Sequence, residues 1–377
     1  MHRPTILIAG GHVTPSIALI EKLQEMGSFD IAYVGRMFAM EGDSVPSYEY
    51  RELTRRGIKF IPIIAGRLQR SFTAYTFVSL AKIPVGFWQA LQIIHRVKPS
   101  LVVSFGGYVA LPLALTASFF RIPIIAHEQT SLPGLANKII GRFAQTVCIS
   151  WPQTAAYFPQ KKIVLTGNPL RKEFLSRTMK PVVVSGGKPL LYISGGSLGS
   201  YAINRAIADI LPQLLEQFVI VHQCGDSALT EDYAFLQDKK SSLPRPLAHR
   251  YTLRSHLDVK EVVWLLLHAF LVVSRSGANT VTELAWSGSP SLLIPLPHAG
   301  NHEQDANALQ LVKAGTAQIL PQSDLTGLQL FNSIDGMVKK IGEYERKKKQ
   351  AQALVHKDAA ERLAGVVSAS IFATTRK

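Results

Sequence analysis

The stretch of sequence that decides the fold is LLYISGGSLG, residues 190–199. It begins with an apolar run that predicts a buried strand and continues into a glycine-rich loop, after which a helix is predicted over about 203–215. Glycines let backbone N–H groups approach a phosphate closely, and the N-terminus of the following helix adds partial positive charge. The loop therefore predicts a diphosphate-binding site, with a tight turn that holds no ligand as the alternative. Its spacing is that of neither a Walker loop nor the G-x-G-x-x-G dinucleotide fingerprint.

Short apolar runs alternate with helical patterns on both sides of this loop. Strands are predicted at residues 6–8, 30–34, 59–64, 101–104, 123–126, 190–194, 218–222, 270–274 and 291–295. Strands that alternate with helices form parallel sheets covered by helices on both faces. The sequence therefore predicts an α/β fold of two doubly wound, Rossmann-like parallel-sheet domains that face each other across a cleft.

A polar stretch over 166–187 separates the two series of strands, as an interdomain connection does. A chain of 377 residues is long enough for two domains. We expect an N-terminal domain over 1–168 and a C-terminal domain over 169–354. A last helix, at about 355–377, is expected to pack back on the N-terminal domain.

Charge and cysteine content limit the classes of protein. Lys and Arg total 41 against 26 Asp and Glu, a formal net charge of +15. This balance favours nucleic acid, acidic lipid or phosphate-bearing substrates, or only a solvated basic surface. Nucleic-acid binding is disfavoured because no RNP1-like, zinc-finger or helix-turn-helix signature is present. Cys148 and Cys224 form no C-x-x-C pair, so neither a disulfide framework nor a zinc site is expected. The expected compartment is the reducing cytoplasm.

Two features bear on membranes. The N-terminus lacks the pattern of a secretory signal, and the longest charge-free apolar run, residues 101–120, is interrupted by Gly106-Gly107 and Pro112. It therefore predicts a strand, a turn and a helix rather than a membrane span. Basic residues also surround an apolar, aromatic stretch, which favours docking on an anionic bilayer, although core aromatic residues explain the stretch equally well. The residues concerned are Arg67, Arg70 and Lys82 with Phe72, Tyr75, Phe77, Phe87 and Trp88.

Two further polar groups follow strands in the second half of the chain. In the loop SRSGANT, residues 274–280, Thr280 has capping-box spacing with Glu283. The carboxylate of Glu283 either caps this helix, which the spacing alone favours, or accepts hydrogen bonds from ribose hydroxyls. A second cluster follows Pro295 and suits either sugar hydroxyls or a polar surface turn. It contains His298, Asn301, His302, Glu303, Gln304 and Asn307.

In the first half, three strand ends carry glycine or polar residues. They are Gly10-Gly11-His12, Gly106-Gly107-Tyr108 and His127-Glu128-Gln129. Because ligands bind where parallel strands end, we expect these segments to meet in one cleft. The unperturbed pKa of histidine suits His12 to act as a general base, whereas a lone histidine in this position is more often structural.

Taken in order, these motifs resemble the MurG family of GT-B glycosyltransferases, which transfer N-acetylglucosamine from UDP-N-acetylglucosamine to lipid I, forming lipid II in peptidoglycan synthesis. The resemblance covers nearly the whole chain. It is carried by Gly11-His12-Val13-x-Pro15, Gly106-Gly107-Tyr108, His127-Glu128-Gln129 with Pro133-Gly134 and Asn137-Lys138, Gly167-Asn168-Pro169-x-Arg171, Gly195-Gly196-Ser197-x-Gly199, residues 274–283, and Asn301-His302-x-Gln304 with Asn307-Ala308.

The resemblance implies an inverting, metal-independent hexosyltransferase with no cofactor, peripheral on the cytoplasmic face of the membrane. It implies an acceptor and membrane-side role for the N-terminal domain, which would bind an undecaprenyl-diphosphate-linked acceptor, and UDP-sugar binding for the C-terminal domain. His12 would be the catalytic base. The donor residues would be Arg171, Gly196, Ser197, Gly199, Asn279, Thr280, Glu283, Gln304 and Asn307. The acceptor residues would be Gly10, Gly11, Gly106, Gly107, Tyr108, Glu128 and Thr130.

The chain departs from the family in two places. Only Gly10-Gly11 precede His12, where the family has the longer G-G-T-G-G, and Thr130 stands where the family usually has asparagine. Both changes concern the acceptor. The alternatives are therefore a GT-B transferase with a different acceptor or a UDP-sugar 2-epimerase of similar architecture.

Overall fold

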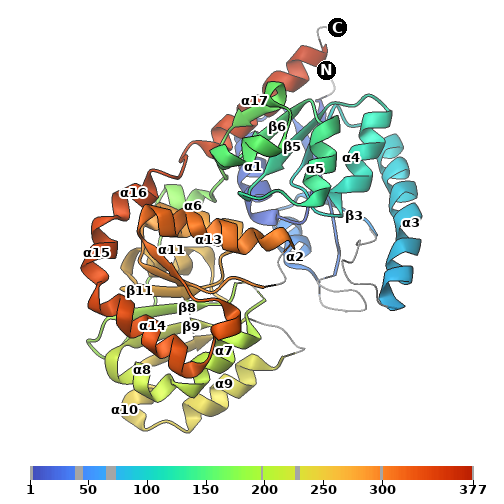
Figure 1. The fold of residues 1–377 in the computed structure, drawn as a ribbon. Helices are drawn as coiled ribbons and strands as arrows, with labels where there is room; N and C mark the ends of the chain where they lie inside the picture. The colour runs from blue at the N-terminus through green and yellow to red at the C-terminus, as the bar shows by residue number, and fades with distance from the viewer. Residues whose placement is uncertain are drawn as a thin grey trace. The chain divides into compact units, whose positions relative to one another are not determined.

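The computed structural model describes residues 3–38, 46–64, 74–196, 198–225, 230–297 and 300–375, without the side chains of 74–82, 301, 374 and 375. The chain forms two units, Met1–Arg171 with His356–Lys377 and Lys172–Val355 (Figure 1). The chain passes from the first unit to the second after Arg171, three residues after the boundary predicted at 168. Each unit has its own sheet and its own core.

The first unit is built from alternating strands and helices. In chain order they are β1 (Thr5–Ala9), α1 (Val13–Met26), β2 (Asp30–Gly35), α2 (Tyr48–Arg55), β3 (Lys59–Pro62), α3 (Ala74–Val97), β4 (Leu101–Ser104), α4 (Ala110–Phe119), β5 (Ile124–Glu128), α5 (Leu135–Phe143), β6 (Thr146–Ile149), the 3-10 helices η1 (Pro152–Tyr157) and η2 (Gln160–Lys162), β7 (Ile163–Leu165) and α17 (Ala359–Thr375).

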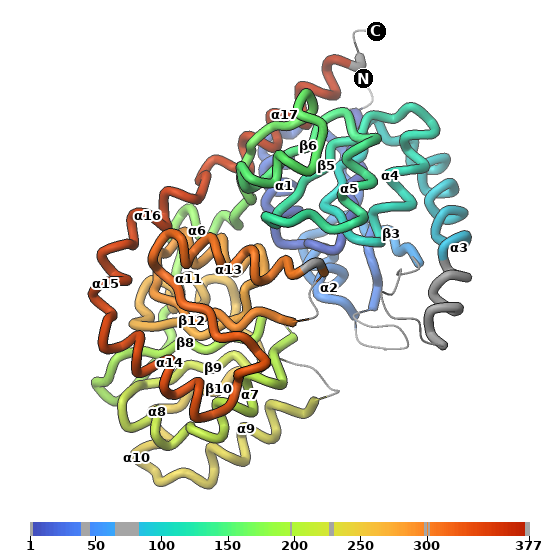
Figure 2. The backbone as a smooth tube through the Cα atoms, in the orientation of Figure 1, coloured from blue at the N-terminus to red at the C-terminus, as the bar shows by residue number. Residues whose placement is uncertain are grey.

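Its described strands form a parallel sheet in the order β3-β2-β1-β4-β5-β6-β7. Alternate residues of β1 enter two different cores. Leu7 and Ala9 face the core shared with α3, α4 and α5, and Ile6 and Ile8 face the core shared with α1, α2 and α17. Helices therefore cover both faces. The last helix returns to this unit, where α17 packs against α1 (Figure 2).

The second unit repeats the pattern. Its elements are α6 (Lys172–Leu175), β8 (Leu190–Ser194), α7 (Tyr201–Asp209), α8 (Leu211–Gln217), β9 (Val219–Gln223), α9 (Asp232–Ser241), α10 (Arg245–Ala248), β10 (Tyr251–Arg254), α11 (Val259–His268), β11 (Leu271–Ser274), α12 (Ala278–Ser287), β12 (Ser291–Leu293), η3 (Gly300–His302), α13 (Glu303–Ala314), β13 (Ala317–Ile319), η4 (Gln322–Asp324), α14 (Gly327–Lys339), α15 (Ile341–Arg346) and α16 (Lys348–Gln352).

The described strands of this unit form a parallel sheet in the order β10-β9-β8-β11-β12-β13. One face packs against α7, α8 and α14 in a continuous apolar core. In Figure 1, α11 and α13 lie on the opposite side of this sheet from α8 and α10. The predicted fold of two doubly wound parallel-sheet domains is confirmed.

Two of the sequence predictions depend on proline and glycine. The helix predicted over 203–215 is two helices, because Pro212 stands at the start of α8 and lacks the N–H that a continuous helix needs. The apolar run 101–120 is β4, a turn and α4, as predicted. Among the described residues, no helix is both long enough and apolar enough to span a bilayer.

Candidate functional site

The glycine loop lies where the strand order of the second sheet reverses direction. β8 and β11 are neighbours at the centre of the sheet, with Ser194 opposite Ser274. The connections from these two strands leave toward opposite edges, so the loops that follow them diverge at the carboxyl ends of the strands. Residues 195–199 and 275–277 form these two loops. The position is the one where doubly wound sheets bind their ligands.

Close backbone packing fixes the shape of the glycine loop. A Cβ atom on Gly199 would lie 1.9 Å from the carbonyl oxygen of Cys224, and one on Gly225 would lie 2.3 Å from the amide nitrogen of Gly199. Both residues have positive φ, +77° and +89°. Gln223 donates a hydrogen bond from its side chain to the carbonyl of Gly196 at 3.4 Å. The end of β9 therefore clamps the loop after β8. Ser197, the predicted hydroxyl donor, lies outside the described residues.

A buried polar network holds the loop after β9 in place. His222 is fully buried and contacts the hydroxyl of Tyr251 at 2.8 Å and the side-chain oxygen of Asn204 at 3.0 Å. Asn204 in turn donates to the carbonyl of Cys224 at 2.9 Å and to Asp232 at 2.9 Å. Burial lowers the pKa of His222 to about 3, so its ring is neutral at physiological pH. The network ties α7 and β10 to the loop after β9.

The second loop carries a half-buried arginine. The guanidinium of Arg275 donates to the carbonyls of Ile294 and Pro295 at 3.0 and 3.2 Å and to the side chain of Gln322 at 2.5 Å. Burial lowers its pKa to about 10, which leaves it charged at neutral pH. Arg275 therefore holds together the ends of β11 and β12 and the segment that follows β13.

The capping interpretation of Glu283 is wrong. Helix α12 begins at Ala278 with Gly277 as its N-cap, earlier than the capping box requires. Thr280 is consequently the third residue of the helix, and Glu283 lies on its second turn, where it cannot reach back to the N-cap. Asn279 and Thr280 lie on the first turn of α12, and Glu283 lies on its second turn. A role for Glu283 toward ribose stays a prediction.

The predicted sugar-binding residues of α13 are tied to the same edge of the sheet. The side-chain oxygen of Gln304 accepts a hydrogen bond from the amide of Leu296 at 3.0 Å. Asn307 is buried and donates to the carbonyl of Ser276 at 3.4 Å, which joins α13 to the loop after β11. His298 and the side chain of Asn301 lie outside the described residues.

The first sheet reverses its strand order between β1 and β4. Gly10-Gly11 follow β1 and Gly106-Gly107 follow β4, and the amide of Gly11 donates to the carbonyl of Gly106 at 3.2 Å. A Cβ atom on Gly106 would lie 2.6 Å from the side chain of Asn137, so a larger residue would not fit. The structure thus brings together the glycine segments that the sequence predicted at two strand ends.

His12 stands directly before α1 as its N-cap residue, and its side chain makes no capping hydrogen bond. The residue is half-buried, and desolvation by the surrounding protein lowers the pKa of His12 to about 4. The imidazole is therefore unprotonated at neutral pH, as a general base must be.

The polar residues at the end of β5 and just after it form hydrogen bonds with one another. The buried carboxylate of Glu128 accepts hydrogen bonds from the amide and hydroxyl of Thr130 at 2.8 and 2.7 Å and from Asn137 at 2.8 Å. Burial raises the pKa of Glu128. His127 contacts the carbonyl of Gly167 at 3.1 Å, so this ring nitrogen carries the proton. Direct contact of Glu128 or Thr130 with an acceptor stays a prediction.

The remaining predicted residues are spread over other positions. Tyr108 is half-buried, and its hydroxyl accepts a hydrogen bond from Arg36 at 3.0 Å. Arg171 is the last residue of the first unit before α6. On the predicted membrane surface, Trp88 is 61% exposed and Phe87 is half-buried. Arg67, Arg70 and Phe72, and the side chains of Tyr75, Phe77 and Lys82, lie outside the described residues.

Sequence patterns alone miss Asn204 and His222. The two residues are 18 positions apart and meet only when α7 packs beside β9. The available signal was a histidine inside an otherwise apolar strand. Within the described part of the chain, no group of three or more His, Cys, Asp or Glu side chains is arranged to hold a metal ion.

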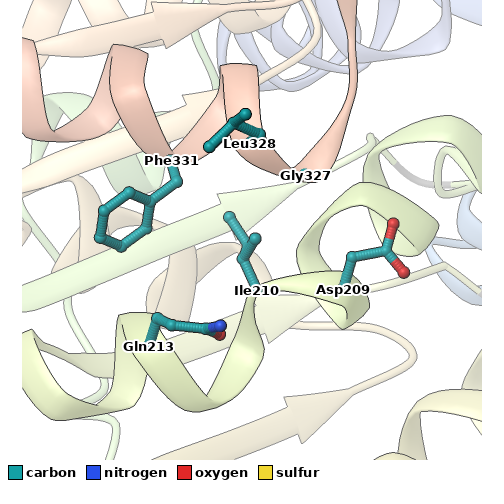
Figure 3. Close-up of a pocket in the computed structure, with 6 residues that line it drawn as sticks. All are labelled: Asp209, Ile210, Gln213, Gly327, Leu328 and Phe331. Carbon is teal, nitrogen blue, oxygen red and sulfur yellow. The ribbon is translucent and has the colours of Figure 1, made fainter.

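A pocket elsewhere on the second unit is not part of this arrangement. It is lined by Asp209, Ile210, Gln213, Gly327, Leu328 and Phe331 (Figure 3). Asp209 ends α7, whereas the glycine loop adjoins the opposite end of that helix. The pocket is therefore separate from the edge where the two loops meet.

Comparisons with known proteins agree with the arrangement of the two sheets. Residues 9–149 match the N-terminal domain model of glycosyltransferase family 28, and residues 190–363 match its C-terminal domain model. The chain is 35% identical over 330 residues to a UDP-N-acetylglucosamine–N-acetylmuramyl-(pentapeptide) pyrophosphoryl-undecaprenol N-acetylglucosamine transferase of Clostridium botulinum (strain Loch Maree / Type A3), covering 86% of this chain and 87% of the relative.

Solved structures share the fold. MurG of Acinetobacter baumannii superimposes with a TM-score of 0.69 at 24% identity, covering 97% of this chain and 99% of that one. The UDP-GlcNAc 2-epimerase of Neisseria meningitidis, bound to UDP-GlcNAc, superimposes with a TM-score of 0.61 at 13% identity, covering 97% and 99%. The fold is thus common to transferases and epimerases, and the sequence match distinguishes them. The MurG-type family resemblance drawn from the motifs is confirmed, and the chain belongs to glycosyltransferase family 28.

Proposed function

We propose that this enzyme transfers N-acetylglucosamine from UDP-N-acetylglucosamine to an undecaprenyl-diphosphate-linked N-acetylmuramyl-pentapeptide, the reaction for which its relatives are named. The observation that carries the proposal is the 35% identity to such a transferase over 86% of the chain. The glycine-lined strand ends of both sheets support it, because each unit then has a place for one diphosphate-bearing substrate.

The second unit is assigned the donor. The backbone of Gly196 and Gly199, with Ser197 and the N-terminus of α7, would hold the diphosphate. The first two turns of α12, with Asn279, Thr280 and Glu283, would bind the ribose. Gln304 and Asn307 would bind the sugar, and Arg171 would complete the donor residues.

The chemistry follows from the neutral ring of His12. His12 takes the proton of the acceptor hydroxyl, whose oxygen attacks the anomeric carbon of the α-linked donor. A bond forms between that oxygen and the anomeric carbon, the bond to UDP breaks, and a β-linkage results. Backbone N–H groups of the glycine loop stabilise the charge that develops on the leaving diphosphate.

Peripheral binding at the cytoplasmic membrane face is supported by one surface of α3. Val85, Trp88 and Leu91 are 42%, 61% and 38% exposed and recur every three residues, which places them along one side of the helix. Such an apolar stripe suits insertion at the headgroup boundary. Vesicle co-sedimentation tests this. Trp88→Ser should weaken binding to anionic vesicles, and Leu328→Ser, at an exposed site of the second unit, should not. Equal binding of both variants would contradict the proposal.

A UDP-sugar 2-epimerase is the second candidate, favoured by the shared fold. An epimerase changes the donor without any acceptor. Incubation with UDP-N-acetylglucosamine alone therefore separates the two, since the transferase should leave the sugar unchanged.

Transfer of radiolabel from UDP-N-acetylglucosamine to lipid I tests the proposed function. We expect robust transfer by the wild type, strong loss with His12→Ala and Glu283→Ala, and little change with Glu216→Ala, an exposed residue of α8. Absence of transfer by a folded wild type would refute the function. Full activity of both site variants would refute the assignment of the site.

A further inference from the structure

Arg36 occupies a position at the acceptor edge that the sequence motifs did not indicate. It follows β2 directly, and β2 pairs with β1 so that Val34 lies opposite Ala9. Arg36 therefore lies beside the Gly10-Gly11 turn. Tyr108 follows β4, on the other side of β1.

A hydrogen bond joins these two residues across the end of β1. The Nη1 group of Arg36 donates to the hydroxyl of Tyr108 at 3.0 Å, and the guanidinium carbon lies 5.6 Å from the centre of the Tyr108 ring. The backbone carbonyl of Arg36 accepts a hydrogen bond from the Ser47 hydroxyl at 2.6 Å. Arg36 is thus held at both its backbone and its side chain, with 34% of the side chain exposed.

The residues already assigned to the acceptor include no cation. They are glycines, Tyr108, Glu128 and Thr130, and His12 beside them is neutral because its pKa is about 4. The amide of Gly11 is occupied by the carbonyl of Gly106. Positive charge strengthens the binding of a diphosphate at this edge, and Arg36 supplies a permanent one.

The carboxyl group of Glu49 lies beside Nε of the Arg36 guanidinium. The two groups approach to 3.7 Å, between Nε of Arg36 and the carboxylate. Glu49 is only 7% exposed, and burial raises its pKa, whereas Arg36 acts to lower it. A planar guanidinium has five N–H donors in a fork that matches phosphate oxygens, so one arginine can contact Tyr108, Glu49 and an anion together.

We propose that Arg36 binds the diphosphate of the lipid-linked acceptor, with Tyr108 fixing the orientation of the guanidinium. This assignment rests on the proposed function. It names a specific contact through which the enzyme recognises an acceptor that carries a diphosphate rather than a neutral lipid.

Steady-state kinetics of two variants and one control test the proposal. Arg36→Met removes the charge at similar length, Arg36→Lys keeps the charge but loses the fork, and Arg55→Met removes a 73% exposed arginine from α2 of the same unit. Arg36→Met should raise the KM for the acceptor roughly 10- to 100-fold, the loss expected for charge-assisted hydrogen bonds. Arg36→Lys should have a smaller effect. The KM for the donor and the kinetics of Arg55→Met should stay unchanged.

A second acceptor separates binding from a merely structural role. With an otherwise identical acceptor that carries a monophosphate, the difference between wild type and Arg36→Met should shrink. The double variant Arg36→Met/Glu49→Gln removes the buried charge that the single change leaves alone, and should reproduce the kinetics of Arg36→Met with a wild-type melting temperature.

Two results would overturn the proposal. One is an unchanged acceptor KM in both Arg36→Met variants, and the other is an equal loss with the diphosphate and monophosphate acceptors. Absence of transfer by the wild type is distinguishable from both, since it refutes the proposed function and this assignment with it.

Discussion

At the scale of single residues, burial keeps His12, His127 and His222 uncharged at neutral pH. The pKa values are lowered to about 4, 4 and 3. The consequences differ because the surroundings differ. His222 has hydrogen-bond partners on both ring nitrogens, whereas the half-buried His12 makes no capping bond with the helix it precedes. Only the surroundings of His12 suit a base that must accept a proton during each turnover.

The pH dependence of the reaction tests the role of His12. The base acts unprotonated, so activity should be lost as the pH falls through about 4, rather than through the usual histidine value near 6.5. His12→Gln should lower kcat about 100-fold or more and leave the affinity for UDP unchanged. Measurement of kcat/KM from pH 8 down to the acid stability limit checks both expectations. An acid limb near 6.5 would show that another group, or a differently placed His12, is titrating.

Replacement of His222 tests the polar network behind the glycine loop. His222→Leu leaves the Tyr251 hydroxyl and the Asn204 side-chain oxygen unsatisfied in a buried place. Each lost partner costs roughly 1–3 kcal/mol, so urea unfolding should show a loss of about 2–6 kcal/mol. UDP affinity should fall as well, because Asn204 no longer fixes the Cys224 carbonyl. His268→Leu, on the surface of α11, is the matched control and should change neither quantity.

At the scale of elements, two loops far apart in the sequence determine each other's shape. Gly199 and Gly225 approach so closely that neither admits a Cβ atom, and both have positive φ. The loop after β9 is thus part of the proposed donor site although it carries no phosphate-binding motif of its own.

Alanine substitution at Gly225 tests this clamp. The new Cβ atom would lie 2.3 Å from the amide nitrogen of Gly199, so the glycine loop must move and UDP affinity should drop at least tenfold. Gly187 also has positive φ, +62°, but a Cβ atom there would meet no neighbouring group within 4 Å. Gly187→Ala should therefore cost only about 1–2 kcal/mol of stability and leave the affinity intact. Equal calorimetric affinities for the two variants would show that the clamp does not position the donor.

The helices and strands were predicted well where the hydrophobic period and the amino-acid composition indicate the same element. They were predicted poorly where tertiary packing determines the element or its ends. The apolar strands β1, β4, β8 and β11 were expected because each is a buried run bounded by glycine or polar residues. β6, β7, β10 and β13 were missed, since strands of three or four residues carry a weak pattern. The start of α12 was misplaced because the spacing of Thr280 and Glu283 imitates a capping box, and the backbone around Gly277 decides otherwise.

The candidate site was predictable only in its motif-bearing parts. The glycine segments and His12 follow strand ends, so the fold class alone places them at the correct edge. Arg36, Asn204 and Arg275 act through partners that lie far away in the sequence, up to 72 positions for Arg36 and Tyr108. No local pattern encodes such contacts, which exist only once the sheets have formed.

At the scale of the whole molecule, each unit contains a buried histidine whose pKa is lower in the folded chain than in the unfolded chain. His127 is fully buried in the first unit and His222 in the second. Their folded-state pKa values lie below the unfolded value of 6.5, so between these limits the unfolded chain binds protons that the folded chain does not. Stability is therefore complete above about pH 6.5 and falls as the pH decreases, by roughly 1.4 kcal/mol per pH unit for each histidine.

Urea unfolding at pH 7.5, 6.5, 5.5 and 4.5 checks this dependence in both units. The free energy of unfolding should be level between the first two values and fall increasingly steeply below them. His222→Gln should flatten the decline, because glutamine does not titrate. A stability that rises on acidification to pH 5 would contradict the assignment of neutral buried histidines.

Binding of the UDP diphosphate by the loop after β8 is the step on which the proposed mechanism depends, and a crystal structure with UDP-N-acetylglucosamine measures it directly. The diphosphate should contact the backbone amides of residues 195–199, with the ribose against Glu283 on α12. A nucleotide bound at the Gly10-Gly11 turn of the first unit, or in the pocket at the far end of α7, would contradict the mechanism.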